Sequence, residues 1–125
     1  MSNFWNALSN SITTTVPTVM AITIICCMAS YSIARNSKNK FYTVIYYLFL
    51  IAILIPFQSI MLPLYIDLKK YGLLNTRLGF VLTKIGFQIA FTILIITGFV
   101  KSVPLELEEA AEMDGAGRFR IFWRI

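Results

Sequence analysis

The sequence has no histidine, and its two cysteines, Cys26 and Cys27, are adjacent. Zinc and related metal ions are usually held by His and Cys side chains that converge on one point. Adjacent residues on a helix point about 100° apart, so these two thiols cannot easily share one ion. The composition therefore argues against a protein metal site, and we expect no bound cofactor.

Charged residues are also scarce, at 14% of 125 residues, whereas 58% are hydrophobic. A soluble domain of this size needs a surface in which about a quarter to a third of the residues are charged. The apolar residues form three long runs, at about 12–34, 42–65 and 78–100. Each run would form a helix about 34 Å long, enough to cross a hydrocarbon core of about 30 Å. We therefore predict an all-α integral membrane protein with three transmembrane helices, and not a soluble bundle.

Prolines lie in the first and second apolar runs, and we expect different effects in the two. Pro17 lies within the first two turns of the first run, where the missing amide donor costs least. Pro56 and Pro63 interrupt the outer half of the second run. A proline inside a span bends the helix and is tolerated where other helices or water satisfy the freed backbone groups. The second run is therefore either a kinked span that lines a cavity or a helix that ends early and continues along the interface.

The basic residues predict the orientation of the chain in the bilayer. Of the eleven Lys and Arg residues, seven lie between the first two runs or after the third, three lie between the second and third, and Lys84 lies within the third. The seven are Arg35, Lys38, Lys40, Lys101, Arg118, Arg120 and Arg124, and the three are Lys69, Lys70 and Arg77. The positive-inside rule then places the C-terminal segment in the cytoplasm and the N-terminus outside. Basic residues follow the first run and none precedes it, which argues against a cleaved signal peptide. The same rule accounts for the net charge of +5, so this charge does not indicate nucleic-acid binding.

The segment 101–125 is the most polar part of the chain. Pro104 is suited to the first turn of a new helix, and the glutamates after it favour the positive end of the helix dipole. We predict a helix from there to about Met113, a stop at Gly115 and Gly117, and a short helical stretch over 118–125. Its narrow face of Leu107, Ala110, Ala111 and Asp114 would either be solvated or receive another protein.

The spacing within this segment resembles a known family. Glu109-Ala110-Ala111, three further residues, Gly115, nine further residues and Ile125 resemble the EAA loop of binding-protein-dependent ABC importer permeases. The resemblance extends upstream and is greatest to carbohydrate importers of the maltose and glycerol-phosphate type. It includes Ser30-Tyr31-Ser32-Ile33-Ala34-Arg35, Pro56, Pro63-Leu64-Tyr65, Gly72-Leu73-Leu74-Asn75-Thr76 and Gly98-Phe99.

This resemblance implies a multi-pass subunit of a bacterial-type inner membrane that imports a sugar or sugar derivative. Its partners would be a second permease subunit, ABC ATPase subunits, an external solute-binding protein and the lipid bilayer. ATP hydrolysis would occur on the separate ATPase, so the chain itself would not be an enzyme. The EAA segment would be the coupling helix, with Glu109, Ala110, Ala111, Asp114 and Gly115 in contact with the ATPase. Such a permease has about six spans, so we expect residues 1–125 to be a fragment of that fold.

Two other functions are compatible with parts of the sequence. A small three-span scaffold or assembly protein could use the acidic cytoplasmic helix to recruit some other soluble partner. An intramembrane enzyme has little support, because Lys84 and Asp67 are isolated and general acid–base chemistry needs groups placed together. The sequence does not indicate which residues would bind the substrate.

Overall fold

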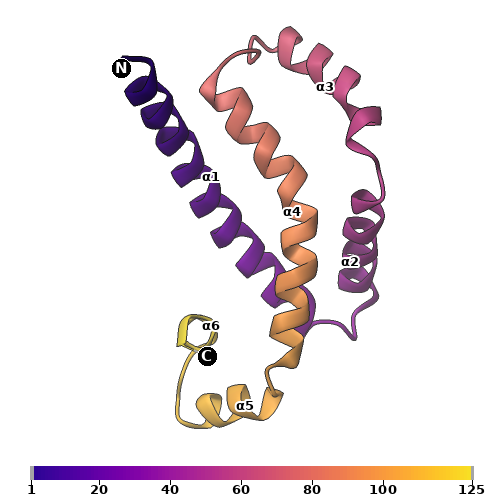
Figure 1. Cartoon of the computed structure of the whole chain (residues 1–125). Coiled ribbons are helices and arrows are strands. Elements are labelled where there is room, and N and C mark those ends of the chain that lie inside the picture. Colours follow the sequence, from indigo (N-terminus) through magenta and orange to yellow (C-terminus); the bar gives the residue numbers. More distant parts are fainter. Residues whose placement is uncertain (1, 125) are drawn as a thin grey trace.

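The computed structural model describes residues 2–124, which form six α-helices and no strand (Figure 1). The helices are α1 Ser2–Arg35, α2 Lys40–Ile53, α3 Phe57–Lys70, α4 Arg77–Ser102, α5 Leu105–Met113 and α6 Arg118–Arg124. The prediction of an all-α fold is therefore confirmed. Ile125, the last residue of the EAA spacing, lies outside the described residues.

Two helices, α1 and α4, are each long and apolar enough to cross a membrane by themselves. α1 begins at Ser2, well before the first apolar run. Pro17 consequently lies inside the helix, and its predicted place in the first two turns is wrong. The polar residues from Asn3 to Ser11 continue the helix because nothing in this stretch breaks the backbone hydrogen-bond ladder.

The second apolar run is divided between two helices. α2 ends at Ile53, and α3 starts at Phe57 after a bend of 97°. Pro56 occupies the N-cap position of α3 with extended backbone angles. α2 ends before Pro56, because proline disfavours helical geometry in the residue that precedes it and has no amide hydrogen to continue the helix. The range 42–65 is thus not one straight helix, and a third span exists only if α2 and α3 cross the membrane together.

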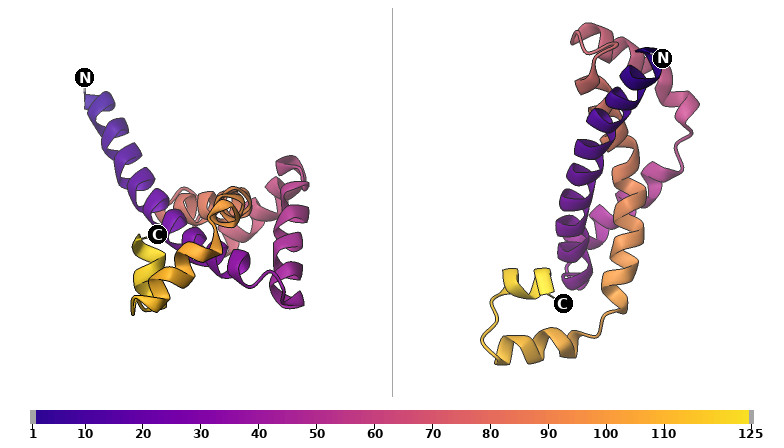
Figure 2. Two further views of the ribbon diagram at one scale, coloured as in Figure 1. Left: turned by 90° about the horizontal axis from the view of Figure 1, so that it is seen from below. Right: turned by 60° about the vertical axis from the view of Figure 1, so that its left-hand side comes forward.

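The core lies between α1 and α4, which run side by side, while α2 packs on another side of α4 (Figures 1 and 2). Small residues form the contact: Cys26 and Ser30 of α1 have no exposed surface. The Ser30 hydroxyl donates to the Ile93 carbonyl at 3.3 Å, and the Cys26 thiol lies 3.8 Å from the Ile89 carbonyl. Small side chains let two helix backbones come close. Helices in a bilayer commonly pack in this way, because the hydrophobic effect does not drive their association in lipid.

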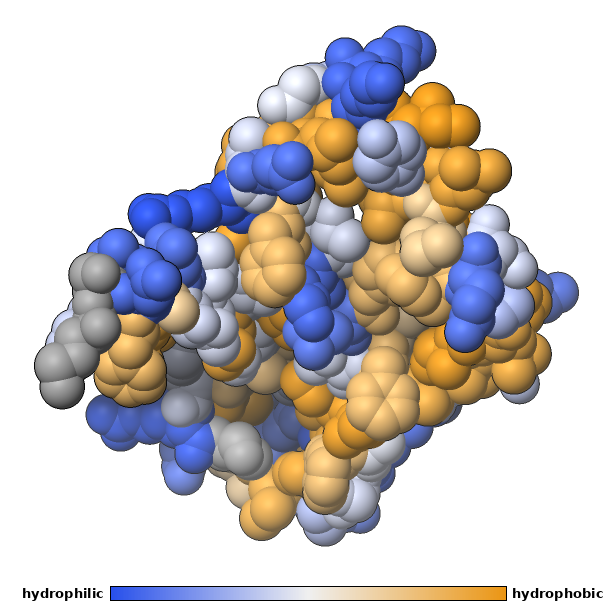
Figure 3. All heavy atoms as spheres, turned by 45° about the horizontal axis from the view of Figure 1, so that its top comes forward, coloured by the Kyte–Doolittle hydropathy of each residue, from blue (hydrophilic) through white to orange (hydrophobic). Residues whose placement is uncertain are grey.

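Much of the outer surface is apolar. Figure 3 shows wide hydrophobic areas interrupted by separate polar groups. Large apolar side chains are exposed along α1, α2 and α4, including Ile24, Leu48 and Phe91. A water-soluble monomer rarely exposes continuous apolar areas of this extent, whereas lipid tails or further spans cover them in a membrane protein.

Candidate functional site

The α5 helix crosses the end of the bundle at which α1 ends and α4 ends (Figures 1 and 2). α4 ends at Ser102, and α5 begins at Leu105. The two residues between these helices, Val103 and Pro104, have extended backbones. Glu106 and Glu108 lie in the first turn of α5, where unpaired amides and the helix dipole favour negative charge. The chain thus changes direction at a proline and presents its acidic turn beside the transmembrane helices.

The C-terminus of α5 is closed by hydrogen bonds typical of a glycine-terminated helix. The amide of Gly115 donates to the Glu112 carbonyl at 3.0 Å, and the amide of Ala116 donates to the Ala111 carbonyl at 2.9 Å. Gly115 has φ of +80°, the left-handed conformation that this cap requires and that glycine adopts without steric cost. This turn sends the chain back toward the bundle.

The returning helix α6 is anchored beside the C-terminal part of α1. Ile121 is only 2% exposed, although it comes from a seven-residue helix. Its neighbour Phe122 packs edge-on against Tyr31, with ring centroids 5.4 Å apart. Edge-to-face aromatic pairs of this kind contribute about 0.5–1.5 kcal/mol beyond the area that they bury.

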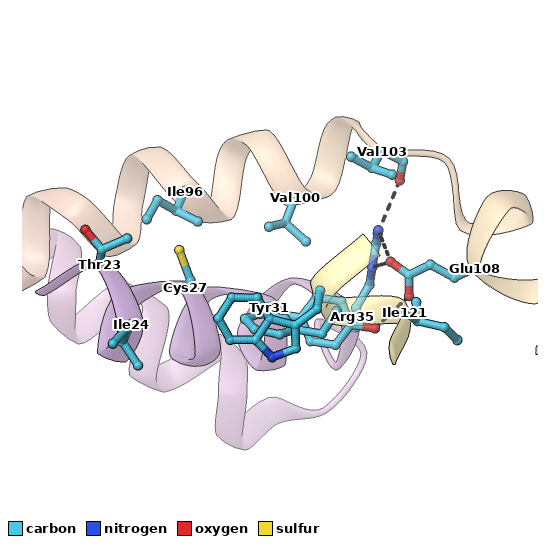
Figure 4. A pocket seen from close by; sticks show the side chains of 12 residues that line it. Thr23, Ile24, Cys27, Tyr31, Arg35, Ile96, Val100, Val103, Glu108 and Ile121 are labelled. Carbon is cyan, nitrogen blue, oxygen red and sulfur yellow. Dashed lines mark hydrogen bonds and ion pairs between the residues drawn. The ribbon is translucent and has the colours of Figure 1, made fainter. Parts of the chain in front are cut away.

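A polar cluster connects α1, α4 and α5 at the same place (Figure 4). We call Tyr31, Arg35, Val103 and Glu108 the Arg35 cluster. Nε of Arg35 donates to Oε1 of Glu108 at 2.6 Å, and Nη2 of Arg35 also forms an ion pair with this oxygen. The Tyr31 hydroxyl donates to the other carboxylate oxygen, Oε2, at 2.9 Å. Nη1 of Arg35 donates to the Val103 carbonyl at 3.3 Å.

The electrostatics of the Arg35 cluster agree with the helix ends that meet there. Arg35 is the last residue of α1, and it also contacts the carbonyl that follows α4, so its positive charge lies near two helix C-termini. Glu108 lies near the N-terminus of α5. Both side chains are only 13% exposed, so water screens their attraction weakly. Hydrogen bonds to charged groups contribute about 1.5–3 kcal/mol each, which makes this cluster a firm link between the helices.

An apolar cavity of about 300 Å³ lies beside the Arg35 cluster, between α1, α4 and α6 (Figure 4). Cys27, Ile96 and Val100 line it, together with Trp123 of α6. Apart from the Arg35 cluster, its walls offer few groups able to bind a polar substrate. Among the residues that the structure describes, no three His, Cys, Asp or Glu side chains are grouped so as to hold a metal ion.

The residues predicted to contact an ATPase lie on α5 and its cap. Glu109, Ala110, Asp114 and Gly115 are exposed, and Ala111 is half-buried. Three large apolar side chains of the helix are also exposed, those of Leu105, Leu107 and Met113. The proposed contact residues are thus mostly accessible to a partner, and their role stays a prediction.

The sequence interpretation missed the Arg35 cluster. In the sequence, Arg35 is a loop charge that predicts orientation and the last residue of the motif that begins at Ser30, whereas Glu108 is one of the glutamates that follow Pro104. The predicted topology contained a clue, because it placed the ends of the first and third spans on the same side of the membrane, with opposite charges close to both. Lys84, the lysine inside the third apolar run, is exposed, and its Nζ lies 5.6 Å from the centroid of the Phe80 ring.

Comparison with known proteins places the chain in a transport family. Residues 21–125 match the family described as binding-protein-dependent transport system inner membrane component. No solved structure matches the chain significantly.

Three relatives are each named as permease proteins of transport or uptake systems. The chain is 40% identical to a probable starch degradation products transport system permease protein of Thermoanaerobacterium thermosulfurigenes, over 98% of this chain and 44% of that protein. It is 37% identical to a multiple sugar-binding transport system permease protein of Streptococcus mutans, over 98% and 43%. It is 32% identical to a diacetylchitobiose uptake system permease protein of Streptomyces coelicolor, over 99% and 41%.

The chain therefore spans less than half the length of these relatives. The resemblance noted in the sequence, to carbohydrate importer permeases, is confirmed by both the family match and the relatives. Since the match covers most of the chain and the helices are apolar enough for a bilayer, this protein belongs to the family of binding-protein-dependent transport system inner membrane components.

Proposed function

We propose that this chain is part of a permease subunit of an ABC importer for a sugar or sugar derivative, and that α5 is its coupling helix. The family match supports the transport role. The names of the relatives, which concern starch degradation products, multiple sugars and diacetylchitobiose, support a carbohydrate substrate. A second permease subunit, ABC ATPase subunits and an external solute-binding protein complete the proposed importer.

One observation carries the proposal for α5: a short helix outside the long spans, closed by a glycine cap at its C-terminus, presents an uncovered apolar face. Leu107 is 53% exposed and Met113 is 89% exposed, and Ala110 lies between them on the same side of the helix. Exposed apolar side chains around a small residue suit a close contact with another protein. Glu109, Asp114 and Gly115 lie at or next to this face. With Ala110 and the half-buried Ala111, they are the residues for which the EAA resemblance implies contact with the ATPase.

The proposed orientation places the segment 101–125 in the cytoplasm and the N-terminus of α1 outside. The distribution of lysine and arginine supports this orientation. α1 and α4 then cross the membrane, and the α2–α3 pair forms the remaining membrane segment of the range 1–100. The ATPase would meet α5 from the cytoplasm, and the solute-binding protein would approach the opposite side.

In this mechanism, closure of the ATPase subunits displaces α5, and α5 displaces the spans. A helix held at both ends can transmit such a displacement as a rigid body, because packed helices shift as units and resist local deformation. Here α5 is held by the Arg35 cluster near its start and by the glycine cap and α6 at its end.

The test uses a complete importer that carries this segment, with Ala110→Glu compared against Ala110→Ser. Ala110 is exposed, so neither change disturbs the packing within the chain. The glutamate adds charge and volume at the centre of the docking face, whereas serine stays small. We expect Ala110→Glu to reduce both co-purification of the ATPase and sugar uptake about tenfold, at an unchanged amount of permease in the membrane. Equal ATPase retention and uptake in the two variants would contradict the coupling role.

The scaffold alternative predicts a different result in the same experiment. A scaffold helix would retain a soluble partner other than an ABC ATPase, and sugar uptake would not depend on Ala110. The three relatives named above are permeases, so they give this alternative no support.

A further inference from the structure

We propose that Arg35 and Tyr31 are positioning residues that fix the coupling helix to the first span, so that α5 moves together with α1. This inference rests on the proposed function of α5. It assigns to the Arg35 cluster a role that docking alone does not require. The cluster would make the membrane helices move when α5 moves.

The covalent connection between α4 and α5 is poorly suited to transmit a displacement. Val103 and Pro104 both have extended backbones, with ψ of 121° and 136°. The helical hydrogen-bond ladder therefore stops at Ser102 and starts again at Leu105. A short extended link between two helices is the kind of place at which a hinge bends. If α5 were attached only there, a push on α5 would rotate it about this link.

The Arg35 cluster bridges this link from outside. Arg35 holds the link itself through the Val103 carbonyl, and it holds α5 through the Glu108 carboxylate. Tyr31 lies one helical turn before Arg35 on the same face of α1 and holds the second oxygen of that carboxylate. Two donors from successive turns determine the orientation of Glu108 as well as its distance. α5 is thereby attached to α1, a helix distant from it in the sequence.

Several features mark this contact as more than a surface ion pair. Three other acidic side chains of α5, those of Glu106, Glu109 and Glu112, are exposed, whereas Glu108 is largely shielded from water. Tyr31 also packs against Phe122, so the same turn of α1 holds the helix that follows α5. α1 in turn makes the most extensive helix contact in the fold, along α4. A displacement received at Glu108 can thus reach the core of the membrane part.

The experiment measures coupling and local order separately. In the complete importer, Arg35→Glu, Glu108→Arg and the double exchange are compared with Lys38→Glu, which makes the same charge change in the exposed loop after α1. The single variants at the cluster should keep the ATPase and its ATP hydrolysis but lower the sugar imported per ATP hydrolysed about tenfold. The double exchange should restore part of this ratio, because it forms the ion pair again but reverses the charges at the helix ends and cannot replace the hydrogen bond to the Val103 carbonyl. Lys38→Glu should leave the ratio unchanged.

Amide hydrogen exchange provides a readout independent of the ATPase. In the full chain reconstituted in lipid, exchange within residues 105–113 should accelerate about tenfold in Arg35→Glu and less in Tyr31→Phe, with no change in Lys38→Glu. The proposal is overturned if the single variants keep normal coupling and normal exchange, or if they release the ATPase as Ala110→Glu does. If Ala110→Glu retains the ATPase while Arg35→Glu accelerates exchange, the docking function fails and the attachment of α5 to α1 stands.

Discussion

Replacement of Gly115 by alanine isolates the backbone geometry that ends α5. Gly115 has φ of +80°, and its amide closes the last turn of α5. A β-carbon built at this position meets no atom within 4 Å, so the substitution causes no collision with other parts of the chain. Its effect therefore comes from the left-handed conformation alone, which costs an L-residue about 1–2 kcal/mol.

We expect the cap to be destabilised by about 1 kcal/mol in total, because alanine also restricts the unfolded chain, which stabilises the folded form by about 0.4–1 kcal/mol. This corresponds to about a fivefold change in the equilibrium between the closed and the frayed cap. Gly117→Ala is the matched control, because a β-carbon there also meets no atom within 4 Å and φ is in the ordinary range. Asparagine tolerates the left-handed region better than alanine does, so Gly115→Asn should lose less.

The assay is amide hydrogen exchange of the peptide that covers residues 110–117, measured in lipid on the full chain. Gly115→Ala should accelerate exchange about fivefold, Gly115→Asn should give a smaller increase, and Gly117→Ala should match the unaltered chain. Gly115→Pro should exceed all of these, because proline also removes the amide that donates to the Glu112 carbonyl. Identical exchange in Gly115→Ala and Gly117→Ala would refute the assignment of this cap to a left-handed glycine.

Two further predictions concern packing. At Gly79 a β-carbon would lie 2.2 Å from the backbone oxygen of Leu73, so Gly79→Ala should lower the free energy of unfolding by about 1–3 kcal/mol. Gly86→Ala should not lower it, because the β-carbon at that position has open space around it. Thermal unfolding in detergent compares the two variants. Ser30→Ala should lower the free energy of unfolding by about 0.6 kcal/mol, because the hydrogen bond to α4 is lost. Ser30→Leu should lower it more, because the site has no exposed surface and no room for a larger side chain. A denaturation series in which the alanine variant is the less stable of the two would contradict this order.

Local features of the polar segment were predictable because their causes are near in sequence. Pro104 starts α5, the first-turn glutamates agree with the helix dipole, and Gly115 ends the helix at the predicted place. The second apolar run shows the limit of such reasoning. Pro56 and Pro63 both indicate an interruption, yet the chain breaks before Pro56 and continues as a helix through Pro63. The cost of a proline depends on which neighbours satisfy the freed carbonyl, and those neighbours are set by the fold.

The class of protein and the position of the polar segment 101–125 follow from the sequence alone. Runs of apolar residues long enough to cross a bilayer, few charges and a specific spacing around Gly115 are local properties, and each has a local physical cause. The attachment of that segment to the long helices, in contrast, depends on the tertiary structure. Arg35 and Glu108 are 73 residues apart, and each has an ordinary explanation where it stands in the chain. Their pairing depends on the direction in which α5 leaves α4 and on the depth at which α1 ends. These are set by the packing of α1 against α4, which no single segment contains.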